Sequence, residues 1–128
     1  MRHTCEQVIE EILEARLDAL DHLTGGAARD MSGELDNYAL SVEYIPPGTF
    51  EDQEEGYLRY QMMWGAVCDE FRFFLSRGLA CRRIEYWFAD GLDRAHRVCT
   101  GNATVQRLWL WLSNTGAVAA AMPPVARH

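Results

Sequence analysis

Apolar residues recur at helical spacing in the first part of the chain. At about 100° per residue, the apolar side chains between residues 5 and 23 share one broad arc, and acidic side chains fill the opposite side. The arc contains Val8, Ile9, Ile12, Ala15, Ala19, Leu20 and Leu23, and the acidic side contains Glu10, Glu11, Glu14, Asp18 and Asp21. Thr4 and Gln7 have the spacing of a capping box, and Gly25 supplies a stop. The pattern predicts an amphipathic helix over residues 5–23.

Arg16 is a charged residue within the apolar arc of this helix. A long basic side chain in such a place either extends to the rim or meets a carboxylate from elsewhere in the chain. Because long side chains tend to keep their charge in water, we expect Arg16 to extend to the rim.

After Gly56 the apolar spacing changes from the helical period to a period of two. Apolar residues alternate in three strong segments and a weaker one: Leu58, Tyr60, Met62 and Trp64; Phe71, Phe73 and Leu75; Ile84, Tyr86 and Phe88; and His96 with Val98. The residues between them are mostly charged: Arg59, Gln61, Glu70, Arg72, Arg83, Glu85 and Arg97. Short connections favour antiparallel neighbours. We expect a meander with one packed face and one wet face, and Arg/Glu pairs across strands.

The flanking segments complete the predicted fold. Residues 25–56 are mixed: YALSVEYI suits a short strand or a helix, and PPGTFEDQEEG an acidic loop. A last helix is predicted over Ala103–Asn114, with Asn102 as its cap, Gly116 as its stop, and Leu110 and Trp111 available for a second contact. Together these elements predict an α+β domain over residues 1–116, with both helices packed on a sheet of about four strands. Residues 117–128 are expected to be a flexible tail.

Charge is distributed unevenly along the 128 residues, whose net charge is −7. Residues 1–70 hold sixteen acidic residues and four arginines, whereas residues 71–128 hold three and eight. The acidic excess argues against a general nucleic-acid binder, because duplex affinity comes mainly from basic groups. No apolar run approaches a membrane span, and the acidic start does not suit a signal or transit peptide. We therefore expect a cytoplasmic protein.

Few residues suggest covalent chemistry. Cys68 is a candidate nucleophile with His96 as its base, but two acids follow Cys68 and would raise the pKa of its thiol. Asp69 and Glu70 are adjacent in a predicted strand and so would point to opposite faces, which suits an acid/base pair poorly. The four cysteines lack metal-ligand or redox spacing. We expect no enzyme, no metal and no cofactor.

Three stretches, WGAVCDEFRFF, RRIEYWFADGLDRA and VQRLWLWL, resemble a group of small uncharacterised proteins of phages, plasmids and integrated elements. That group has a WGGP-like turn, an acidic-aromatic strand and an EYWF-x-DW-x-D-x-A stretch. The matching residues are Trp64, Gly65, Asp69, Phe71, Glu85, Tyr86, Trp87, Phe88, Asp90, Asp93 and Ala95. Ala66, Val67 and Gly91 depart from the pattern, all in turns. The resemblance implies an α+β meander of mobile-element origin, and it supplies no catalytic residue.

These observations predict a protein that acts in a bacterial host cell by binding another protein. The resemblance points to an inhibitor of a host defence system, of the anti-CRISPR type. The expected contacts with a basic partner surface are Glu10, Glu14, Asp18, Asp21, Glu51, Asp52, Glu54 and Glu55, with Leu110 and Trp111 as apolar anchors. The alternatives are a structural or homo-oligomeric accessory protein without a host target, and a small enzyme that uses Cys68 and His96. Either a monomer or a homodimer is compatible with the sequence.

Overall fold

The structure, a computed structural model, describes residues 4–24, 38–76 and 80–121. Its elements are α1 (Cys5–Thr24), β1 (Ser41–Ile45), β2 (Tyr57–Met63), β3 (Val67–Leu75), β4 (Cys81–Asp90), β5 (Asp93–Val98), α3 (Ala103–Asn114) and α4 (Ala117–Ala121). The five strands pair antiparallel in chain order. The predicted α+β class is confirmed, with five strands instead of four because Ser41–Ile45 pairs with β2.

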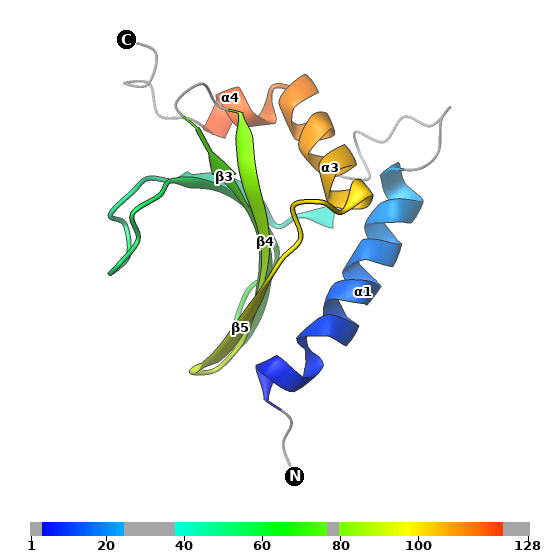
Figure 1. Cartoon of the computed structure of the whole chain (residues 1–128), viewed down its shortest axis with the longest axis vertical. Helices are drawn as coiled ribbons and strands as arrows, with labels where there is room; N and C mark the ends of the chain where they lie inside the picture. The colour runs from blue at the N-terminus through cyan, green and yellow to red at the C-terminus, as the bar shows by residue number, and fades with distance from the viewer. Residues whose placement is uncertain (1–3, 25–37, 77–79, 122–128) are drawn as a thin grey trace.

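The helices and the sheet form two layers, with α1 and α3 on one side of the strands (Figure 1). The core between them contains fully buried side chains from both layers: Ile9, Leu20, Leu58, Tyr60, Phe71, Phe73, Ile84, Tyr86, Val105, Leu108 and Leu112. Burying each such side chain contributes roughly 1.5–3 kcal/mol. The apolar side chains that the alternation placed on the packed face of β2, β3 and β4 therefore do face the helices, apart from Trp64.

Within the described residues, no helix is long and apolar enough to cross a membrane.

Arg16 joins α1 to the sheet. Its guanidinium donates to both carboxylate oxygens of Asp69 on β3, at 2.7 and 3.0 Å, and the Asp69 side chain is fully buried. The Tyr86 hydroxyl donates to the same carboxylate at 2.6 Å. Our expectation that Arg16 extends to the rim was wrong. Asp69 faces the helix layer, and a buried carboxylate without a cation would cost several kcal/mol.

The predicted phase of β5 was also wrong. His96 pairs with Trp87 and lies on the sheet face away from the helices, whereas Ala95 pairs with Phe88 and is buried in the core. Directly paired residues share a face, so the outward position of Trp87 determines that of His96. A shift of one residue moves every side chain of a strand to the other face, and the weak alternation of this segment did not specify it.

The C-terminal helix has the predicted bounds and cap. The Asn102 side chain accepts hydrogen bonds from the backbone N–H groups of Thr104 and Val105, at 2.9 and 3.2 Å. Trp109 stacks on Phe73 with the ring centroids 5.3 Å apart, which fixes α3 against β3. Residues 117–121, expected as part of a flexible tail, form α4, and Val118 packs into the core. The rest of that tail lies outside the described residues.

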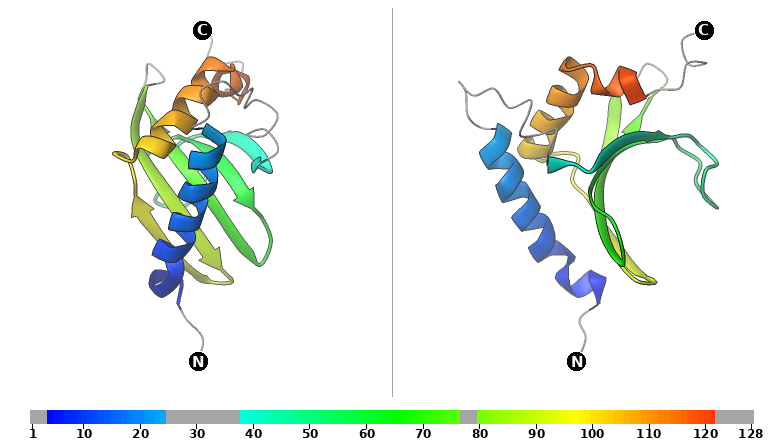
Figure 2. Two further views of the ribbon diagram at one scale, coloured as in Figure 1. Left: turned by 90° about the vertical axis from the view of Figure 1, so that its right-hand side faces the viewer. Right: turned by 180° about the vertical axis from the view of Figure 1, so that it is seen from behind.

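The sheet curves away from α1 and α3, so its uncovered face is concave (Figure 2). The connection between β1 and β2, residues 46–56, extends beyond the sheet on this concave side. We call this connection the arm. The fold thus leaves one sheet face open, with the arm beside it.

Candidate functional site on the concave face of the sheet

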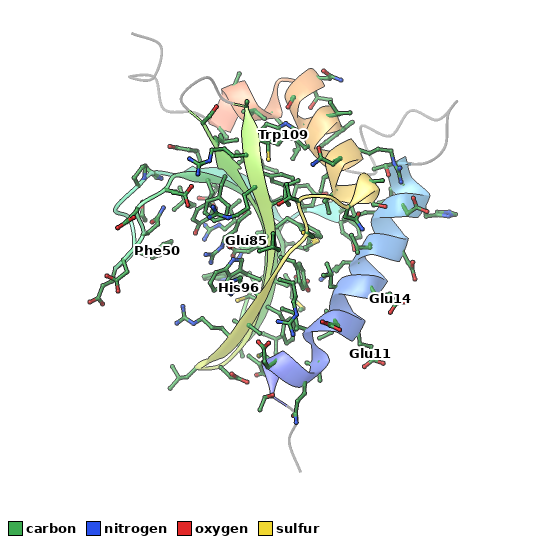
Figure 3. All side chains as sticks on the ribbon, viewed as in Figure 1. Glu11, Glu14, Phe50, Glu85, His96 and Trp109 are labelled. Atoms are coloured by element: carbon green, nitrogen blue, oxygen red, sulfur yellow. The ribbon has the colours of Figure 1, made fainter. Side chains whose placement is uncertain are left out.

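The arm and the concave face border an open cavity of about 650 Å³, which we call the cup. Residues 50–55 of the arm form its wall, and side chains of the sheet, including Tyr57, Arg72, Trp87 and His96, form its floor. Figure 3 shows Phe50 of the arm on the same side of the sheet as Glu85 and His96, opposite the helices. The volume is that of a small-molecule site or of a pocket for a few side chains.

A continuous stack of flat side chains crosses the floor of the cup. The Arg72 guanidinium lies 4.7 Å from the Tyr57 ring centre and 4.0 Å from the Trp87 ring centre. On the next strand, His96 stacks on Trp87 with the ring centroids 4.4 Å apart and the planes 11° apart. We call Tyr57, Arg72, Trp87 and His96 the ladder. Its contacts are of the cation–π and stacked type and connect four strands.

Two arginines of the floor, Arg72 and Arg83, are neutralised by neighbouring carboxylates. Arg72 donates through Nε to Glu70 at 2.7 Å, and Arg83 donates to Glu85 at 2.8 Å and to Glu55 at 2.9 Å. We expected this face to be wet, but Glu70 and Glu85 are only 7% and 8% exposed. The expectation was wrong because the concave shape and the ladder cover these carboxylates. Their hydrogen-bond partners are therefore arginines and not water.

One end of the cup is apolar and contains an unpaired hydroxyl. Ile45, Tyr57 and Phe74 form a small cluster separate from the main core. Tyr57 is 1% exposed, and within the described residues its hydroxyl has no hydrogen-bond partner. Burial raises the pKa of this hydroxyl, although nearby Arg72 acts in the opposite direction. The group is therefore a neutral, buried hydroxyl whose donor and acceptor are unused by the residues that the structure describes.

The arm is a structured loop held by one glutamine. The Gln53 amide donates to the carbonyl oxygens of Pro46 and Glu55, at 2.9 and 2.7 Å, and accepts from the backbone N–H of Phe50 at 3.0 Å. Phe50 is 51% exposed. The arm thus presents an ordered surface with an aromatic side chain accessible to solvent.

Three of the four predicted arm acids form no salt bridge with another described residue. Glu55 pairs with Arg82 at 3.0 Å as well as with Arg83. Glu51, Asp52 and Glu54 are exposed, and none has an ion pair within the described part of the chain. Their negative charge is available to a ligand.

The predicted acidic stripe on α1 is partly neutralised. Glu10 pairs with Arg97 at 3.2 Å, and Asp21 pairs with Arg107. Glu14 and Asp18 are exposed and have no ion pair among residues 4–24, 38–76 and 80–121. The stripe and the arm lie on opposite sides of the sheet (Figure 3), so the two predicted acidic sets do not form one surface.

The apolar anchors predicted on α3 differ in exposure. Leu110 is 57% exposed, whereas Trp111 is half-buried and packs against the main core. Trp64, which the alternation placed with the packed residues, is instead 70% exposed beyond the end of β2. The pairing of β2 with β3 is irregular between Gln61 and Met63, and this irregularity ends the regular alternation.

Cys68 and His96 are not brought together as a catalytic pair. They lie on β3 and β5, separated by β4, and two strand spacings alone amount to roughly 10 Å. Burial raises the pKa of the Cys68 thiol, and the carboxylates of Glu70 and Asp69 raise it further. The described residues also contain no group of three or more His, Cys, Asp or Glu side chains arranged to hold a metal ion.

Sequence reasoning placed Arg72 and Trp87 correctly on the uncovered face but did not identify the ladder. The outward alternation of these residues was the available signal. The inverted phase of β5 hid His96, whereas the inward position of Leu58 was an available signal that its neighbour Tyr57 faces outward.

In comparisons with known proteins, no family model, curated protein or solved structure matches the chain. The resemblance to mobile-element proteins stays a prediction.

Proposed function

We propose that the protein is an accessory protein of a mobile genetic element that inhibits a host defence component by binding to a basic surface of it. In this proposal the cup and the arm are the contact surface, and no covalent chemistry is involved. The supporting observation is that Glu51, Asp52 and Glu54 are exposed beside an aromatic floor and have no salt bridge within the described part of the chain. Half of the α1 stripe is already paired with arginines.

Charge and shape have separate roles in such a complex. Unpaired carboxylates at the arm speed the encounter with a lysine- or arginine-rich surface and exclude acidic partners. Phe50, half-exposed near these carboxylates, supplies apolar contact area of the kind that dominates binding energy. Nucleic-acid-binding grooves of CRISPR effectors and of other defence nucleases are basic surfaces of this type.

The proposal is tested by challenging defended bacteria with phage while they express the protein or its variants. Phage should grow on defended bacteria that express the unaltered protein, but not on those that express the arm variant Glu51→Arg/Asp52→Arg/Glu54→Arg. The matched control Glu11→Arg/Glu14→Arg/Asp18→Arg changes the net charge equally on the opposite sheet side and should still permit phage growth. Failure of the unaltered protein to restore phage growth against any tested defence system would contradict the function, and loss in the control alone would contradict the assigned surface.

A homo-oligomeric accessory protein is the second candidate, supported by the exposed Leu110 on α3. Light scattering combined with size exclusion separates the two functions. The accessory function would be favoured if the unaltered protein is a dimer, Leu110→Glu converts it to a monomer, and neither the dimer nor the monomer affects bacterial defence.

A further inference from the structure

We infer that the cup receives an arginine side chain from an extended segment of the partner, with the guanidinium stacked on the free face of His96. This inference rests on the proposed function, because it names the chemistry by which the same surface recognises its partner. It is supported by the geometry of the ladder, the distribution of charge around the cup and the polar groups in its floor.

The ladder has an open end. Trp87 covers one face of the His96 ring, and His96 is an exposed residue of the edge strand β5, so its other face is free. A planar guanidinium on that face would extend the alternation of rings and guanidinium that Tyr57, Arg72 and Trp87 already show. The site is therefore shaped for a flat group, unlike the compact ammonium of lysine.

The charge of the cup favours a cation. Arg72 and Arg83 are compensated by their carboxylate partners, which leaves Arg94 as the one lining arginine without an ion pair among the described residues. The arm wall has three carboxylates, those of Glu51, Asp52 and Glu54, that form no ion pair with another described residue, so they outnumber this one cation. A guanidinium between His96 and the arm would gain carboxylate acceptors in a fork arrangement, which an anionic ligand would not.

The floor also contains a buried hydroxyl without a partner among the described residues, which indicates an occupant with polar backbone groups. Tyr57 lines the cup, and within the described residues its buried hydroxyl makes no hydrogen bond. Arg72 also lines the cup, and its bond to Glu70 uses Nε, so its two terminal nitrogens can donate to an occupant. Carbonyl oxygens of an extended peptide would satisfy these donors.

Short synthetic peptides test the inference without an identified partner. Three Gly/Ser nonapeptides that differ only in a central residue, arginine, lysine or citrulline, are titrated into the whole protein by calorimetry. Arginine should bind about three- to tenfold more tightly than lysine, the difference expected for a stacked guanidinium, and citrulline should not bind measurably. His96→Ala should weaken arginine binding by a similar factor, and His96→Phe, which keeps a flat ring, should restore it.

Equal binding of the arginine and lysine peptides, no effect of His96→Ala, or no binding of the arginine peptide at millimolar concentration would each overturn the inference. Circular dichroism of the His96 variants establishes that they fold. These outcomes are separable from the proposed function. If the arm variant loses phage protection while the peptides do not discriminate, the function stands without the arginine site; if the peptides discriminate but phage growth is never restored, the site stands without the function.

Discussion

Removing one partner of the buried ion pair between Arg16 and Asp69 should strongly destabilise this fold, because the other charge would be left buried without a counter-ion. Asp69→Asn removes the negative charge but keeps the shape of the side chain, leaving the guanidinium without its counter-ion and the Tyr86 hydroxyl with an altered partner. Removing one member of a buried pair costs about 3–5 kcal/mol. The Arg16 side chain is 22% exposed and retains some water, so we expect the lower end, about 3 kcal/mol.

A loss of this size is measurable, since domains of this kind are stable by about 5–15 kcal/mol. Urea unfolding followed by tryptophan fluorescence should show a lower midpoint, and the Tm should fall by roughly 10–15 °C. The control is Glu14→Gln on the exposed side of α1, which should change stability by less than about 0.5 kcal/mol. A cost below about 1 kcal/mol for Asp69→Asn would refute the reasoning that this pair joins α1 to β3.

Other substitutions and conditions test separate parts of the structure. Asn102→Ala removes two cap hydrogen bonds from α3 and should cost about 1 kcal/mol by urea unfolding, whereas no loss would contradict the cap. Gly56→Ala places a Cβ against the Tyr44 hydroxyl at the base of the arm, and 2.9 Å from Tyr44 Cζ, so it should cost about 1–3 kcal/mol; an unchanged Tm is the contrary result. Tyr57→Phe removes a hydroxyl without a partner and should leave the free protein equally or more stable, so a loss above about 1 kcal/mol would reveal a missed hydrogen bond. Burial, together with nearby Glu85, raises the pKa of the Cys99 thiol from 9.0 to about 12. The unfolded state should therefore lose this proton first, and the folded state should lose stability as the pH rises above 9. Alkylation of Cys99 at pH 8 should be slower in the folded protein than in urea.

Local patterns predicted the helices and the inner faces of three strands because each signal was complete within a short segment. The arc on α1, the Asn102 cap and the alternation at Ile84, Tyr86 and Phe88 needed no knowledge of distant residues. β1 was ambiguous, since a five-residue strand is defined by its partner more than by its own pattern.

The cup was not predictable because it depends on curvature and on pairing between distant segments. Arg16 meets Asp69 across 53 residues of sequence, and the ladder takes its members from four strands. The face of His96 follows from its pairing with Trp87, which periodicity alone could not determine. The sequence predicted the acidic residues of the arm and the outward positions of Arg72 and Trp87, but not the ladder or the cup.

The most direct test of the account is the affinity of a purified defence target for three proteins: the unaltered chain, the arm variant and the α1 control variant. We predict that reversing Glu51, Asp52 and Glu54 weakens binding by about a hundredfold or more, as expected for several charge pairs of roughly 1.5 kcal/mol or more each, and lowers its salt dependence. The control should stay within about threefold of the unaltered chain. Equal affinity of the arm variant, or loss confined to the α1 control, would contradict a binding surface on the concave side of the sheet.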